Sequence, residues 1–142
     1  MQDFSIFVAQ NLWLCLLFGV LLAAVVVTEL RRSAKGGQQI SPQAAVMMMN
    51  RGNPQLIDIR DSARFNQGHI AGARQIDAKT DKIDWAQVLP EKDQKLLLIC
   101  ERGQSVLKVA DQLQKLGYTN ANILAGGMTA WRDANLPITK GA

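Results

Sequence analysis

The chain has 142 residues, a formal net charge of +4 and 48% hydrophobic residues, so it has room for one ordinary domain and a short additional segment. Its acidic and basic residues are interspersed, and no Lys/Arg run is interleaved with aromatic residues, which argues against binding to nucleic acid. The sequence has one histidine, which excludes a metal site that needs several imidazoles.

The N-terminal segment is uncharged between Asp3 and Glu29. As a helix, these twenty-five residues rise roughly 37 Å at about 1.5 Å each, enough to cross a hydrocarbon core near 30 Å. The sequence therefore predicts an N-terminal segment 1–32 with a transmembrane helix over about residues 5–28, which binds the lipid bilayer. A cleaved signal peptide is the alternative. It requires positive charge before the apolar run and a small-x-small site after it, and this sequence has neither.

Basic residues follow the apolar run and none precedes it. Because Arg31, Arg32 and Lys35 come directly after it, the positive-inside rule predicts a single pass with the N-terminus outside and the remainder in the cytoplasm. Of the two cysteines, Cys15 then lies in the bilayer and Cys100 in a soluble domain. A structural disulfide is not expected, in keeping with a reducing compartment.

A Gly-rich polar linker at residues 33–39 precedes the soluble domain at 40–142. The pattern predicts a helix at 42–50 capped by Ser41, a strand at 56–60, a helical turn to 65, a strand at 73–76, a helix at 83–89, a strand at 96–99, a helix at 106–116, a strand at 122–124 and a helix at 127–134. This alternation predicts an α/β domain with a mainly parallel central sheet and helices on both faces. Ligands of such folds bind at the carboxyl ends of the strands.

Cys100 lies at such a strand end and is the most informative residue of the chain. It follows the apolar run 96–99 and precedes the amphipathic helix at 106–116. The loop between them consists of Glu101, Arg102, Gly103, Gln104 and Ser105. This layout places the thiol over a positively polarised helix N-terminus, where the reactive thiolate is favoured. We interpret Cys100 as a candidate nucleophile and the loop as its substrate-binding segment.

Three segments in this order resemble the signatures of the rhodanese domain family. They are IDIRDSARFNQGHIAGA at 57–73, CERGQS at 100–105 and GGMTAWRDANLPI at 126–138, and they span nearly all of residues 38–140. The resemblance implies a rhodanese-like fold and a sulfurtransferase that needs no metal or organic cofactor. Cys100 would take sulfane sulfur from a small donor anion such as thiosulfate, become a persulfide, and pass the sulfur to a thiol or a cyanide-like acceptor. The tethered single domain also resembles small bacterial inner-membrane proteins of this family.

The loop residues suit this chemistry on physical grounds. Gly103 lets the backbone curl so that successive N–H groups can stabilise a thiolate or persulfide anion. Arg102 is either a cation that attracts an anionic donor or a solvated loop charge. Ser105 either donates a hydrogen bond to the sulfur or caps the following helix.

Two positions of the sequence bear on which activity is expected: one on the turnover of thiosulfate and one on phosphate hydrolysis. Glu101 departs from family members that carry a positive residue beside the cysteine, and its charge is expected to weaken turnover of dianionic thiosulfate. Phosphatases of the same architecture use a C-x5-R loop whose arginine grips phosphate. Val106 stands at that position here, so phosphate hydrolysis is not expected.

Three further polar residues are expected to support the site structurally. Asp58 and Arg60 lie at a strand end, where a buried ion pair that ties the cysteine loop to neighbouring strands is favoured over a catalytic role. His69 is favoured as a turn residue over a general base. A second hypothesis for the whole chain is a docking module at the cytoplasmic membrane face, with a membrane-protein partner and weak or no catalysis.

Overall fold

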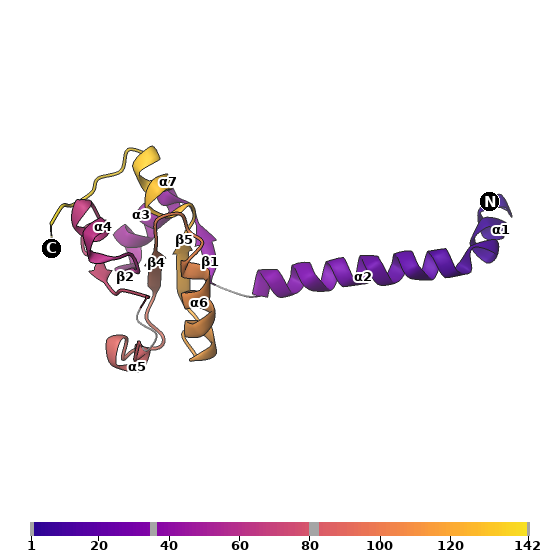
Figure 1. The fold of residues 1–142 in the computed structure, drawn as a ribbon, viewed down its shortest axis with the longest axis horizontal. Coiled ribbons are helices and arrows are strands. Elements are labelled where there is room, and N and C mark those ends of the chain that lie inside the picture. The colour runs from indigo at the N-terminus through magenta and orange to yellow at the C-terminus, as the bar shows by residue number, and fades with distance from the viewer. Residues whose placement is uncertain (1, 35–36, 80–82, 142) are drawn as a thin grey trace. The chain divides into compact units, whose positions relative to one another are not determined.

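The computed structural model describes residues 2–34, 37–79 and 83–141, and Figure 1 shows the fold. The chain divides into two compact units, Met1–Lys35 and Gly36–Ala142. Lys35 of the basic cluster and the part of the predicted linker at 35–36 lie outside the described residues.

The N-terminal unit consists of helix α1 (Gln2–Gln10) and helix α2 (Leu12–Ala34). Asn11 separates them, and its side chain donates a hydrogen bond to the Phe7 carbonyl at 3.0 Å. Within the described residues, one stretch is long and apolar enough to cross a membrane: the 19 residues Leu12–Leu30 of α2. Nineteen helical residues rise about 28 Å. This stretch overlaps the predicted span of about residues 5–28, which stays a prediction, and α1 and α2 meet at Asn11 within that span.

The second unit is built on a five-stranded sheet in which every pairing is parallel, with the order β1-β5-β4-β2-β3. The strands are β1 (Gln38–Ile40), β2 (Gln55–Asp58), β3 (Arg74–Gln75), β4 (Leu96–Ile99) and β5 (Ala121–Leu124). All four residues of the central strand β4 are buried, as a strand covered on both faces requires. The predicted α/β fold with a parallel sheet is confirmed.

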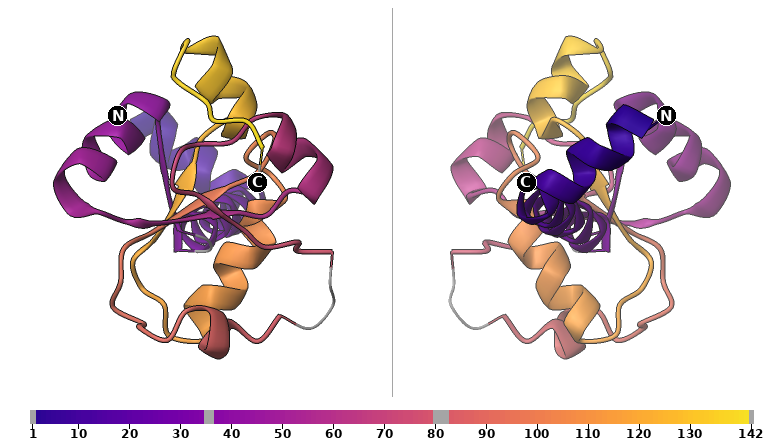
Figure 2. Two further views of the ribbon diagram at one scale, coloured as in Figure 1. Left: turned by 90° about the vertical axis from the view of Figure 1, so that its left-hand side faces the viewer. Right: turned by 90° about the vertical axis from the view of Figure 1, so that its right-hand side faces the viewer.

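Helices cover both faces of this sheet, as Figure 2 shows. They are α3 (Pro42–Gly52), α4 (Ser62–Gln67), α5 (Trp85–Val88), α6 (Val106–Lys115) and α7 (Gly127–Asp133). Val109 and Leu113 of α6 pack with Leu98 of β4 in one core cluster. Ala45 of α3 and Trp131 of α7 belong to a second cluster with other β4 side chains. The two clusters hold β4 between them, and this fixes its carboxyl end in the middle of the domain.

Several predicted boundaries shift. The strand β1 occupies the end of the predicted linker, and its Gln38 lies opposite Asn122 of β5. The sequence does not reveal this edge strand, because its glutamines give no alternation of apolar and polar residues. The helix expected at 83–89 shortens to the four residues of α5, and the strand expected at 73–76 shortens to β3. Ser41 caps α3 as predicted, since its hydroxyl accepts from the Ala44 N–H at 3.2 Å.

Candidate active site

Cys100 immediately follows β4 and is only 3% exposed. Its Sγ accepts a hydrogen bond from the backbone N–H of Gly103 at 3.0 Å. Gly103 has φ +77°, and a Cβ at this position would lie 2.9 Å from the Gly126 nitrogen. Only glycine satisfies both conditions without strain. The loop therefore turns back on itself and aims an amide at the sulfur.

The N-terminus of α7 holds the start of this loop. Met128 donates its N–H to the Cys100 carbonyl at 2.9 Å, and Thr129 donates both its N–H and its hydroxyl to the Glu101 carbonyl at 3.0 Å. With the first two carbonyls of the loop held by another helix, the loop backbone is fixed from outside as well as by its own hydrogen bonds.

Asp58 and Arg60 form a buried ion pair at the end of β2. Arg60 donates from Nη2 to Asp58 Oδ2 at 2.7 Å and from Nε to Oδ1 at 2.9 Å. The same guanidinium reaches the Gly68 carbonyl at 2.9 Å and the Glu101 carboxylate at 3.1 Å. Arg60 thus connects β2, the end of α4 and the cysteine loop by hydrogen bonds, and its supporting role stays a prediction.

Glu101 sits between two arginines. Its Oε1 accepts from Arg132 Nη1 at 2.6 Å, and its Oε2 accepts from Arg60 Nη1 at 3.1 Å. Burial alone would raise the pKa of Glu101, but the hydrogen bonds and charges of Arg132 and Arg60 outweigh it and hold the pKa below its ordinary value. Burial likewise opposes the charge of Arg60, yet hydrogen bonds to Asp58 and Glu101 raise its pKa. Both groups are therefore charged at neutral pH.

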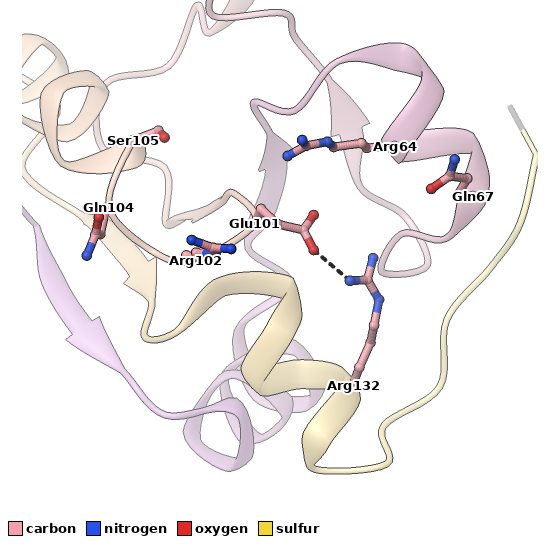
Figure 3. Close-up of a pocket in the computed structure, with 7 residues that line it drawn as sticks. All are labelled: Arg64, Gln67, Glu101, Arg102, Gln104, Ser105 and Arg132. Carbon is pink, nitrogen blue, oxygen red and sulfur yellow. Dashed lines mark hydrogen bonds and ion pairs between the residues drawn. The ribbon is translucent and has the colours of Figure 1, made fainter.

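A polar cavity of about 770 Å³ opens over the loop (Figure 3). Its lining residues are Arg64, Gln67, Glu101, Arg102, Gln104, Ser105 and Arg132. Figure 3 shows the side chains of Arg64, Glu101 and Arg132 converging on this space from α4, the loop and α7. Sequence reasoning missed Arg64, Gln67 and Arg132. The sequence gives little indication of their role, since each is a polar residue of a helix, within the segments 57–73 and 126–138 that resemble the family.

The loop residues predicted to bind substrate lie as follows. Arg102, Gln104 and Ser105 line the cavity with Glu101, whereas Gly103 shapes the backbone. Ser105 stands at the N-cap position of α6 with φ −60° and ψ −29°, and its side chain makes no capping hydrogen bond. Helical torsions at that residue keep the hydroxyl from the extended N-cap geometry, so the capping alternative is wrong.

His69 forms an isolated antiparallel bridge with Thr139, two residues before the turn at 71–72. Its Nδ1 is 3.0 Å from the Phe65 carbonyl, and its ring stacks on the Phe65 ring with centroids 3.8 Å apart. Its backbone exchanges two hydrogen bonds with Thr139, at 2.8 and 2.9 Å. These partners belong to α4 and the C-terminal segment, not to the cysteine loop. Within the described ranges, no three His, Cys, Asp or Glu side chains are placed to hold a metal ion.

Residues 41–134 match the family described as the Rhodanese-like domain. The chain belongs to this family. It is 35% identical over 101 residues to thiosulfate sulfurtransferase GlpE of Haemophilus influenzae, which covers 71% of this chain and 93% of that protein. It is 26% identical over 144 residues to the uncharacterized protein YibN of Escherichia coli K12, which covers 99% of both.

Solved structures show the same fold. A rhodanese-related protein from Thermoplasma volcanium superposes with a TM-score of 0.61 at 20% identity, covering 72% of this chain and 97% of that one. The Rhodanese-like domain of the Alr3790 protein from Anabaena superposes with a TM-score of 0.64 at 22% identity, covering 72% and 78%. Family membership places the protein in the sulfurtransferase superfamily, and its rhodanese-like domain bears Cys100 at the position described above.

Proposed function

We propose that this rhodanese-like protein is a membrane-anchored sulfurtransferase that carries sulfane sulfur as a persulfide on Cys100. The observation that carries this proposal is the hydrogen bond from Gly103 N–H to Cys100 Sγ, in a loop between a central strand and a ten-residue helix. A backbone N–H directed at the sulfur can stabilise the negative charge that the sulfur carries during transfer. The identity to GlpE supports the same assignment.

The proposed reaction has two steps. The Cys100 thiolate attacks the outer sulfur of thiosulfate, an S–S bond forms on the cysteine, and the S–S bond of thiosulfate breaks with sulfite leaving. A thiolate or cyanide acceptor then attacks the terminal persulfide sulfur, the Cys100 S–S bond breaks, and the Cys100 thiolate returns. Charge balances in each step, so no oxidant or cofactor enters.

Mass spectrometry of the full chain in detergent tests the carrier residue. Incubation with thiosulfate, and separately with an organic persulfide, is expected to add the mass of one sulfur atom that a reductant removes. Cys100→Ser is expected to abolish the adduct, whereas Cys15→Ser, in the apolar helix, retains it. An adduct that persists on Cys100→Ser, or no adduct on the wild type with either donor, would refute the assignment.

The cellular arrangement belongs to the same proposal. The apolar stretch Leu12–Leu30 anchors the chain in the inner membrane, and the basic residues after it keep the rhodanese-like domain in the cytoplasm. Reporters fused to Ala142 test the orientation: one that folds only in the cytoplasm is expected to be active, and one that folds only outside is expected to be silent. Complementation distinguishes the docking hypothesis, since full rescue of a deletion by Cys100→Ser would favour binding over catalysis.

A further inference from the structure

We propose that Glu101 sets donor specificity by occupying Arg132, so that the site discriminates against compact dianionic donors and favours an organic persulfide. This inference rests on the proposed function, because it concerns which donor loads Cys100. It goes beyond that function by assigning the choice of donor to one ion pair at the cavity.

The first step of the argument is the position of the carboxylate. Glu101 is the residue directly after Cys100 and lines the same cavity as Arg132. Both of its oxygens already accept hydrogen bonds from arginines, at 2.6 Å from Arg132 and 3.1 Å from Arg60. Its negative charge is therefore held in place at the cavity wall, on the residue that follows the nucleophile, and it does not swing freely in solvent.

The second step is the balance of charge around the cavity. Three arginines line it, but Arg132 is paired with Glu101 and is not fully available to an incoming anion. Arg60 does not make up for this, since its charge is matched by Asp58 in a buried pair. The other two cations of the lining are Arg64, which pairs with Asp61 outside the cavity, and Arg102, which forms no ion pair with any carboxylate of the described residues. Glu101 thus lowers the charge of the lining from that of three arginines to a net +2 and occupies one of the cations that a dianion would bind.

The third step is the size of the space. A cavity of about 770 Å³ lies in the range of about 300–1,000 Å³ that is typical of sites for small organic ligands. An anion of the size of thiosulfate leaves most of that volume to water. An organic group attached to the donor sulfur would fill it, with the polar side chains of Gln67 and Gln104 at its wall.

The donor step then follows without a further reagent. The Cys100 thiolate attacks the outer sulfur of R–S–SH, a new S–S bond forms on Cys100, and the S–S bond of the donor breaks. The R–S⁻ leaving group takes the electron pair, and the proton stays on the transferred sulfur until solvent removes it. The donor brings at most one negative charge to Glu101, half that of thiosulfate.

The test compares two donors on variants of the full chain in detergent. The donors are thiosulfate and the persulfide of N-acetylcysteine methyl ester, whose organic group is uncharged. Glu101→Gln keeps an acceptor oxygen for Arg60 and removes the charge. It is expected to raise kcat/KM for thiosulfate by about tenfold, mostly through a lower KM, and to change that of the persulfide by less than about twofold. Glu91→Gln, the same substitution at an exposed position away from the cavity, controls for net charge.

A second variant keeps the test decisive if Glu101→Gln folds poorly. Arg132→Gln leaves the Glu101 charge less compensated and is expected to lower the ratio of thiosulfate to persulfide kcat/KM. In Glu101→Gln/Arg132→Gln, the gain toward thiosulfate is expected to disappear. An unchanged ratio of thiosulfate to persulfide kcat/KM in all three variants would overturn the inference. If Cys100 is still loaded with sulfur in that case, the proposed function stands. No loading from either donor would instead overturn the proposed function.

Discussion

Gly127 lies directly against the Cys100 carbonyl, at the point where α7 meets the cysteine loop. A Cβ at Gly127 would lie 2.7 Å from the Glu101 carbonyl carbon and still closer to the Cys100 carbonyl oxygen. The next residue, Met128, donates its N–H to that same carbonyl at 2.9 Å. The close approach of α7 is therefore what allows one helix to hold the backbone of the nucleophile's loop.

Gly127→Ala is expected to displace this loop. Gly127 has φ +60°, so the substitution adds backbone strain to the steric overlap and is expected to destabilise the fold by about 1–3 kcal/mol. Sulfur loading of Cys100 should fall on the order of 10²-fold, the scale of a misplacement of about 1 Å. Single-turnover mass spectrometry measures the loading. Gly72→Ala is the control, because Gly72 also has a positive φ, +81°, but faces open space. Equal loading losses in the two variants would contradict the contact.

Arg60→Gln is expected to cost far more stability than Arg64→Gln. Removal of Arg60 leaves the Asp58 carboxylate buried without its cation, a loss of about 3–5 kcal/mol in the free energy of unfolding. The Arg64 ion pair with Asp61 is solvent-exposed and contributes little to stability. Denaturant unfolding followed by tryptophan fluorescence compares them. Equal losses of stability in the two variants would show that the buried pair does not stabilise the carboxyl end of β2.

Tyr118→Phe tests an anchor that the sequence did not reveal. The buried Tyr118 hydroxyl donates to the Leu89 carbonyl at 2.6 Å and lies 3.1 Å from the Trp85 carbonyl. The substitution keeps the ring and leaves both carbonyls without this donor, so the free energy of unfolding should fall by about 1–3 kcal/mol. The same denaturant titration measures it, and loading of Cys100 should stay within about twofold. A variant as stable as the wild type would argue against the anchor.

The stability of the domain is expected to fall in acid partly through Glu101. Its pKa is lower in the folded protein than the ordinary 4.5, so folding favours the ionised carboxylate. The stabilisation is complete above the ordinary pKa and is lost as pH falls through the lowered value of the folded state. Thermal unfolding against pH measures this. Wild type and Glu91→Gln should lose more stability between neutral and acid pH than Glu101→Gln, and parallel curves for all three would refute it.

Sequence patterns determined the α/β class, the parallel sheet and the position of Cys100 at a strand's carboxyl end. They suffice because the spacing of apolar residues along a short stretch of chain indicates a buried strand, as at 96–99, or an amphipathic helix, as at 106–115. The left-handed turn at Gly103 is local in the same sense. The edge strand β1 was not predicted, because its polar residues show no such spacing of apolar side chains.

Only the tertiary structure decided what surrounds the cysteine. Arg132 meets Glu101 across 31 positions of the chain, and Arg60 meets it across 41. No periodicity relates such residues, since their distance depends on how α7 and β2 pack against the loop. From the sequence alone, Glu101 is a negative charge next to the nucleophile in the chain, with no indication of a partner. The fold instead gives this carboxylate two cations, because packing brings both guanidinium groups within hydrogen-bond distance of it.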